Sequence, residues 1–192
     1  MLYNTCRGLL RLIYAMLYRF EAVGLENIPS TGPVVLCANH ISLLDPPTVG
    51  TKLERKVHYM AKAELFNIPL FGPFIRALGA FPVKRGGVSK EAIRSAIALL
   101  EEGGVMGIFP EGTRNAPATG MAKKGAAMIA MRSNATIIPV AIIGNYRLFR
   151  KMKIRYGQPI DLSAFIQDSS SDVLDRVTDA VMTEIREMTR QG

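Results

Sequence analysis

Short apolar runs alternate with amphipathic helical patterns along most of this chain. Runs of roughly four to eight residues rich in valine and isoleucine are typical of buried strands. The predicted strands are 34–38, 57–60, 80–83, 105–109 and 136–143. Apolar residues three or four positions apart predict helices instead. These predicted helices are 89–102, 125–132 and 171–189. The alternation predicts an α/β fold with a largely parallel mixed sheet flanked by helices.

Because Pro139 cannot donate a backbone hydrogen bond, we expect its strand to be an edge strand or to contain a bulge.

Residues 2–20 also show helical periodicity, but with two contrasting faces. The apolar face contains Leu2, Leu9, Leu12, Ile13, Met16 and Phe20. The other face interleaves tyrosines with arginines and contains Tyr3, Arg7, Arg11, Tyr14 and Tyr18. Such a helix suits the headgroup layer of a membrane, with its apolar face toward the lipid tails. A spanning helix needs about 20 mostly apolar residues, and the two arginines interrupt the run. We therefore expect residues 1–20 to form a membrane-surface helix and residues 21–192 a single α/β domain. The alternative is an ordinary amphipathic helix packed on the domain.

The charge of the chain is unevenly distributed. Residues 1–160 carry a net charge of +12 and residues 161–192 one of −4. A basic body predicts an anionic partner, which could be nucleic acid, an acidic lipid surface or a phosphorylated substrate. With no tryptophan and 7% aromatic residues, the chain has little on which to stack bases, so we expect no nucleic acid. Two histidines and two cysteines make a metal cluster hard to build. The thiols of Cys6 and Cys37 fit a reducing compartment.

Polar residues gather where the predicted strand 34–38 ends. His40 and Asp45 follow it, five residues apart, just before two prolines that are typical of a helix start. An imidazole at a strand end, oriented by a carboxylate, can take a proton from a hydroxyl near neutral pH. Alternatively, His40 is structural and Asp45 merely caps the helix. Ser42 is predicted to stabilise a turn rather than to act as a nucleophile.

A second polar stretch follows the predicted strand 105–109, with the sequence Phe-Pro-Glu-Gly-Thr-Arg-Asn over residues 109–115. Glu111 and Arg114 stand three residues apart around a glycine. An arginine here can bind a phosphate through a fork of hydrogen bonds. A carboxylate beside it can orient that arginine or bind substrate hydroxyls. The alternative is a surface turn with a local Glu–Arg ion pair, which contributes little to stability.

Together these stretches resemble the glycerolipid acyltransferase family, specifically the 1-acylglycerol-3-phosphate acyltransferases. Residues 39–45 match its H-x-x-x-x-D motif, and residues 109–114 match its F-P-E-G-T-R motif. Residues 79–85 look like the family's second motif, and residues 137–140 look like its fourth, an apolar segment around a proline. All four occur in the family's order. Lys84 stands where an acidic residue is common, which adds charge but leaves the basic residue after it in place.

The resemblance implies a specific reaction. A fatty acyl group would pass from an acyl thioester, acyl-CoA or acyl carrier protein, to the 2-hydroxyl of lysophosphatidic acid, giving phosphatidic acid. His40 would act as general base and Asp45 would orient it. A direct transfer of this kind needs no metal and no tightly bound cofactor. The expected substrate-binding residues are Arg85, Glu111, Gly112, Thr113, Arg114, Asn39 and Lys62. The expected location is the cytoplasmic face of the cell membrane, attached peripherally to its anionic surface.

Several alternatives stay open at this point. The acceptor could be glycerol-3-phosphate or another lysolipid, and a noncatalytic basic lipid-binding module belongs to a different class. Asn39 either tethers its loop or donates a hydrogen bond to substrate, and Lys62 either meets the phosphate or is solvated. His58 is predicted to be structural. The apolar segment 66–80 either walls an acyl-chain tunnel or completes the core. A basic cluster is predicted either to meet anionic headgroups or an acidic carrier protein, or to be a solvated face. Its members are Arg147, Arg150, Lys151, Lys153 and Arg155.

Overall fold

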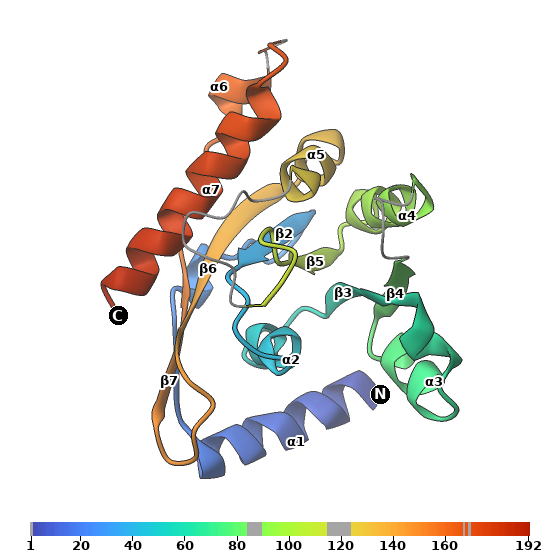
Figure 1. Ribbon diagram of the computed structural model, residues 1–192, viewed down its shortest axis with the longest axis vertical. Coiled ribbons are helices and arrows are strands. Elements are labelled where there is room, and N and C mark those ends of the chain that lie inside the picture. The colour runs from blue at the N-terminus through green and yellow to red at the C-terminus, as the bar shows by residue number, and fades with distance from the viewer. Residues whose placement is uncertain (1, 84–89, 115–123, 167, 169) are drawn as a thin grey trace.

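The computed structural model describes residues 2–83, 90–114, 124–166, 168 and 170–192. Within these residues, seven strands form one central sheet in the order β1-β7-β6-β2-β5-β3-β4 (Figure 1). Neighbouring strands are parallel except β6 and β7, which are antiparallel. This arrangement confirms the predicted α/β fold with a largely parallel mixed sheet. The strands are β1 (Arg19–Val23), β2 (Val34–Ala38), β3 (Val57–Lys62), β4 (Ala80–Val83), β5 (Val105–Ile108), β6 (Thr136–Gly144) and β7 (Lys151–Tyr156).

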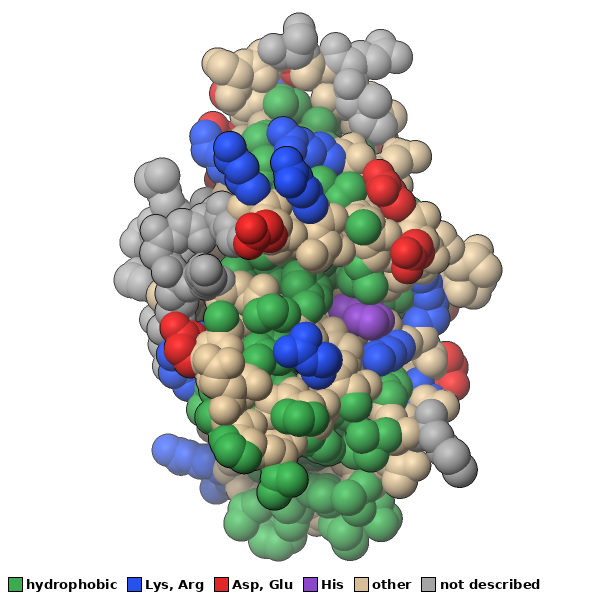
Figure 2. Space-filling model, turned by 90° about the vertical axis from the view of Figure 1, so that its right-hand side faces the viewer, with side chains coloured by type: hydrophobic (Ala, Val, Ile, Leu, Met, Phe, Trp, Pro, Cys, Tyr) green, Lys and Arg blue, Asp and Glu red, His purple; other side chains and the backbone are tan. Residues whose placement is uncertain are grey.

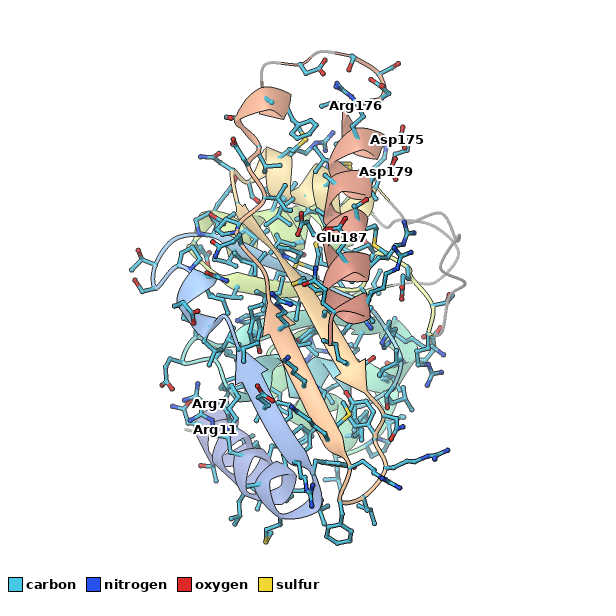
Figure 3. The ribbon with its side chains drawn as sticks, turned by 90° about the vertical axis from the view of Figure 1, so that its left-hand side faces the viewer. Arg7, Arg11, Asp175, Arg176, Asp179 and Glu187 are labelled. Atoms are coloured by element: carbon cyan, nitrogen blue, oxygen red, sulfur yellow. The ribbon has the colours of Figure 1, made fainter. Side chains whose placement is uncertain are left out.

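Helices cover both faces of the sheet (Figure 1). One face carries α4 (Lys90–Glu101), α5 (Gly125–Arg132) and α7 (Val173–Arg190). The other face carries α2 (Asp45–Thr51), against which α1 (Leu2–Leu17) packs. Short elements complete the connections: η1 (Leu25–Asn27), η2 (Ala63–Asn67), α3 (Phe71–Ala77) and α6 (Ser163–Ile166). On α7 the apolar residues face the protein, while charged residues such as Asp175 and Asp179 face outward (Figure 3).

Strand β2 illustrates why the centre of the sheet was easy to predict. All five of its residues are buried. Val35 and Cys37 belong to the apolar cluster under α4, α5 and α7, whereas Val34, Leu36 and Ala38 belong to the cluster on the α2 side. Side chains alternate between the faces of a strand, so a strand buried on both faces is a continuous apolar run. Burial also raises the pKa of the Cys37 thiol to about 12, which leaves it a protonated core residue.

The prediction of an edge or bulge at Pro139 is wrong. Strand β6 lies inside the sheet, between β7 and β2. The carbonyl of Pro139 points toward the β7 side, where it accepts a hydrogen bond of 2.8 Å from the N–H of Gly157. The nitrogen of the same residue points to the same side, and the β7 ladder reaches only from Gly144 to Val140. The missing N–H therefore falls just beyond the last β7 pair, Val140 with Tyr156, so the proline interrupts no hydrogen bond inside the ladder.

Helix α1 packs on the domain through its polar face. Arg7 donates hydrogen bonds to the carbonyls of Leu53 and Glu54, and Arg11 donates one of 2.7 Å to the carbonyl of Thr51. These carbonyls lie at and just beyond the last turn of α2, where no intrahelical donor reaches them and a cation is favourable. From the sequence we expected these arginines to lie among lipid headgroups. In the structure they point toward the rest of the domain instead (Figure 3).

The apolar face of α1 points outward as a consequence. Leu9, Leu12 and Met16 are exposed by 57%, 56% and 59%, and Leu2 by 46%. Figure 2 shows hydrophobic side chains gathered over the lower end of the molecule, where α1 lies in Figure 1. Because its polar face packs on the domain, α1 leaves an apolar surface exposed on the outside of the molecule. Among the described residues, no helix has the length and apolar character that crossing a membrane requires.

Among the described elements, β1, β7 and α3 were not predicted from the sequence, and neither were the short η1, η2 and α6. Around α3, the segment 66–80 does not simply complete the core, because Leu70 is 88% exposed and three neighbours are exposed by more than 40%. These neighbours are Ile68, Phe71 and Phe74. The segment therefore adds a second apolar surface outside the core.

Candidate active site

The loops that follow β2, β5 and β6 meet at one edge of the sheet. Strand β2 pairs in parallel with both β5 and β6, so the carboxyl ends of the three strands lie together. The loop after β2 carries His40 and leads to Asp45, the first residue of α2. The turn after β5 carries Glu111, and the segment after β6 carries Tyr146. This edge is where open α/β sheets usually bind their ligands.

His40 and Asp45 form a hydrogen-bonded pair. The distance between His40 Nδ1 and Asp45 Oδ2 is 2.7 Å. The carboxylate only accepts, so Nδ1 carries the proton and Nε2 is the nitrogen left to receive one. Nε2 makes no hydrogen bond to the residues that the structure describes. The His40 side chain is 18% exposed, so the pair has one buried end and one end open to a substrate.

Asp45 is completely buried and held by four donors. Its Oδ2 accepts the backbone N–H groups of Ile41 and Ser42, each at 2.7 Å, besides the imidazole. Its Oδ1 accepts the hydroxyl of Tyr146, also at 2.7 Å. Helix α2 shows no side-chain cap hydrogen bond. The Asp45 carboxylate thus binds donors in the loop that precedes α2. This arrangement does not fit the alternative that Asp45 merely caps the helix.

Aromatic rings support the imidazole from one side. The rings of His40 and Phe109 are stacked, with centroids 4.2 Å apart, and the ring of Tyr59 is nearly parallel to that of Phe109 with centroids 6.2 Å apart. Strand β5 makes room for this stack at Gly107, where a Cβ would lie 2.1 Å from a ring carbon of Tyr59. The glycine is therefore required by a close approach of side chain to backbone. The stack fixes the plane of the imidazole.

The motif after β5 is tied to His40 through Glu111. Its Oε2 accepts the backbone N–H of His40 at 2.9 Å, so the two loops hold each other. Gly112 closes the turn by donating its N–H to the carbonyl of Phe109, and its φ of 69° favours glycine. Thr113 and Arg114 are exposed, and no ion pair joins Glu111 to Arg114 in the described part of the chain. Arg114 is therefore available to an anion.

Other predicted residues are placed less directly. The side chain of Asn39 pairs with the backbone of Ile142 in β6, donating to its carbonyl at 3.0 Å and accepting its N–H at 2.7 Å. This geometry favours the tether over substrate binding. Lys62 is exposed at the end of β3, and Arg85 lies outside the described residues.

Ser42 and His58 have structural surroundings. The Ser42 hydroxyl accepts the N–H of Leu44 at 3.2 Å, as expected for a turn residue. The ring of His58 contacts the carbonyl of Gly79, with Nδ1 3.0 Å from the oxygen. Burial, together with the charge of Lys56, lowers the pKa of His58. Neither side chain has a hydrogen bond to the His40–Asp45 pair within the described chain.

Sequence reasoning missed Tyr146 and Thr48. Tyr146 follows β6 at the same edge of the sheet as His40 and Glu111, so the rule that found those residues could have found it too. Thr48 gave no signal, because it lies inside α2 and its hydroxyl meets partners distant in sequence, Tyr14 and Tyr146. Together the site offers a base with a fixed orientation, a buried carboxylate behind it, and an exposed arginine three residues after Glu111. Such an arrangement can deprotonate a hydroxyl on an anionic substrate.

Comparisons with known proteins point to one family. A family model described as Acyltransferase matches residues 19–143. The chain is 33% identical to the 1-acyl-sn-glycerol-3-phosphate acyltransferase of Bacillus subtilis, over 97% of this chain and 96% of that protein. It is 29% identical to the enzyme of the same name from Streptococcus pneumoniae, over the whole of this chain and 74% of that protein. The crystal structure of the 1-acyl-sn-glycerophosphate (LPA) acyltransferase PlsC from Thermotoga maritima superposes with a TM-score of 0.75 at 26% identity. That match covers 97% of this chain and 79% of the other. The chain belongs to the acyltransferase family.

Proposed function

We propose that this acyltransferase moves a fatty acyl group from an acyl thioester, acyl-CoA or acyl carrier protein, to the 2-hydroxyl of 1-acylglycerol-3-phosphate. The product is phosphatidic acid for phospholipid biosynthesis. The observation that carries the proposal is the His40–Asp45 pair, 2.7 Å apart with the imidazole partly open to solvent, on a loop tied to Glu111 of the second motif. The acceptor after which the relatives from Bacillus subtilis, Streptococcus pneumoniae and Thermotoga maritima are named supports this choice.

In this mechanism His40 is the general base. Its Nε2 takes the proton of the acceptor hydroxyl as the oxygen attacks the thioester carbonyl carbon. The carbon–sulfur bond then breaks, and the leaving thiolate takes the proton back from the imidazolium. Asp45 stays ionised and stabilises the charged ring while fixing its orientation. A base of this kind typically contributes about 10²–10⁴-fold to the rate. The thioester is already activated, so the proposal needs no metal and no bound cofactor.

The acceptor phosphate would be held by cationic side chains around the pair. Arg114 is exposed in the turn after β5, and Lys62 is exposed at the end of β3. Arg85 joins them on the strength of the family motif alone. The N–H of His40 occupies Oε2 of Glu111, which leaves Oε1 for a substrate hydroxyl. Gly112 and Thr113 would line the same turn.

Peripheral attachment to a membrane completes the proposal. The acceptor is a lipid, and the outward face of α1 offers the apolar side chains of Leu9, Leu12 and Met16. The exposed apolar side chains around α3 form a second such surface. Exposed cations at Arg147 and Arg150 suit anionic headgroups. We place the enzyme on the cytoplasmic face of the cell membrane.

An acyl-transfer assay with three acceptors tests the function. The purified chain would receive an acyl-CoA or acyl carrier protein donor with 1-acylglycerol-3-phosphate, glycerol-3-phosphate or lysophosphatidylcholine, and products would be identified by mass spectrometry. The proposal predicts phosphatidic acid from the first acceptor at the highest kcat/KM. A higher kcat/KM with either of the others would reassign the acceptor, and transfer to none would reject the proposal.

A further inference from the structure

A chain of neighbouring hydroxyl groups runs from Asp45 to helix α1, and its members are the half-buried Tyr146 and the buried Thr48 and Tyr14. Tyr146 donates to Asp45 Oδ1 at 2.7 Å, and its hydroxyl lies 3.1 Å from that of Thr48. The Thr48 hydroxyl in turn lies 2.7 Å from the hydroxyl of Tyr14 on α1. Thr48 and Tyr14 are buried. The mechanism above uses the other oxygen of Asp45, so this chain reaches the carboxylate from behind.

The protons of this chain can be assigned from its distances. Each hydroxyl has one proton to donate. Thr48 donates to the carbonyl of Leu44 at 2.6 Å, so Tyr14 is the donor in its contact with Thr48. Tyr146 gives its proton to the nearer, charged acceptor, Asp45. Burial raises the pKa of both tyrosines, so each keeps the proton that its role requires.

Ring packing connects Tyr146 to the end of the same helix through Tyr18, the residue that follows it. The ring of Tyr18 meets that of Tyr146 edge to face, with centroids 6.1 Å apart, and meets that of Tyr14 at 5.6 Å in the same manner. Such contacts favour one ring orientation over others. Tyr18, the residue after α1, thus contacts the ring of Tyr146, while Tyr14 on α1 contacts the Thr48 hydroxyl. Tyr14 is buried, whereas the leucines on the apolar face of α1 are exposed.

We propose that Tyr146 is a positioning residue for the His40–Asp45 pair, and that α1 supports it through the ring contacts from Tyr14 to Tyr18 and from Tyr18 to Tyr146. The inference rests on the proposed function. Two oxygens of one carboxylate are held from opposite sides: Oδ2 by His40 and its loop, Oδ1 by Tyr146. Without the Tyr146 hydroxyl the carboxylate gains freedom to rotate, and the imidazole loses its fixed direction. The two faces of α1 then have separate functions, one toward the membrane and one toward the catalytic pair.

The decisive experiment compares Tyr146→Phe with Tyr156→Phe. Tyr156 also has a buried hydroxyl bonded to α2, donating to the carbonyl of Val49 at 2.7 Å, but it takes no part in the chain to Asp45. Each variant loses one hydrogen bond of 2.7 Å donated by a tyrosine hydroxyl, and thermal unfolding measures the loss of stability in each. With a short-chain, water-soluble 1-acylglycerol-3-phosphate, Tyr146→Phe should lower kcat by roughly 10- to 100-fold at a nearly constant KM. Tyr156→Phe should keep the wild-type kcat, and so should Tyr14→Phe, which loses its hydrogen bond to Thr48 but keeps its ring contact with Tyr18.

A second readout does not depend on turnover. Proton NMR should show a low-field signal from the His40 Nδ1–H that is bonded to Asp45. Tyr146→Phe should shift or broaden that signal, and Tyr156→Phe should leave it unchanged. An unchanged signal together with wild-type kcat in Tyr146→Phe would overturn the inference, as would equal losses of kcat in both variants. A shifted signal in a protein that transfers no acyl group would support the inference and reject the proposed function.

Discussion

Glu111 and Arg114 stand three residues apart, yet the fold holds them very differently. Glu111 is engaged by the backbone of His40, while Arg114 is exposed and has no ion pair with Glu111 in the described chain. An anchored carboxylate is part of the scaffold of the site. A free guanidinium is available to bind an anion, which is the role proposed for Arg114.

Replacing Arg114 should therefore affect acceptor binding. Arg114→Ala should raise the KM for 1-acylglycerol-3-phosphate by about 10-fold while changing kcat by less than about twofold, since charge-assisted hydrogen bonds contribute roughly 1.5–3 kcal/mol. Steady-state kinetics with varied acceptor measures this split. Arg94→Ala, at an exposed arginine on α4, is the matched control and should leave both constants unchanged. A KM for Arg114→Ala equal to that of the wild type would remove Arg114 from the acceptor site.

His58 predicts a pH dependence of stability. Its pKa is lowered in the folded protein, first by burial and second by the charge of Lys56. As pH falls below the ordinary histidine value of 6.5, the unfolded chain binds a proton before the folded chain does, so the free energy of unfolding decreases. Urea unfolding at about pH 7.5 and about pH 5.5 should show a smaller loss in His58→Gln than in the wild type. Equal losses of unfolding free energy in the two proteins would show that His58 does not contribute to the pH dependence. His40 is present in both proteins, so it does not affect the comparison.

At the scale of elements, we expect α1 to bind membranes through its exposed apolar face. Leu9→Glu or Leu12→Glu places a charge on that face without touching the arginines that hold α1 on α2. Cosedimentation with anionic vesicles should fall several-fold for either variant, because a charge replaces buried apolar area. Thermal stability should stay close to that of the wild type. Ser95→Glu, which adds the same charge at an exposed position of α4, is the control. Wild-type binding by both leucine variants would move the membrane contact away from α1.

The elements also explain which parts of the fold were predictable. β2 and β6 are buried on both faces, so they appear in the sequence as continuous apolar runs. β7 alternates Lys151, Lys153 and Arg155 with buried side chains, a strand pattern that we interpreted only as a basic cluster. β1 was absorbed into the helical pattern before it, since Phe20 matched the apolar face of that pattern by spacing alone.

For the whole molecule, local motifs predicted the reactive pair but not its surroundings. His40 and Asp45 lie five residues apart, and their contact follows from one loop. Tyr146 reaches Asp45 across 101 residues of sequence, and Arg7 reaches Leu53 across 46, so neither contact leaves a local pattern. The polar face of α1 packs inward because its arginines bind the carbonyls at the end of α2, which are also distant in sequence. Such tertiary contacts require the fold before they can be seen.

The central claim is that His40 deprotonates the acceptor hydroxyl, and the initial rate of acyl transfer by His40→Ala tests it most directly. The wild-type chain and the variant would be compared with the same thioester donor and 1-acylglycerol-3-phosphate, after thermal unfolding has shown that both are folded. The account predicts a rate lower by about 10²–10⁴-fold in the variant. A folded His40→Ala protein that transfers acyl groups at the wild-type rate would contradict it.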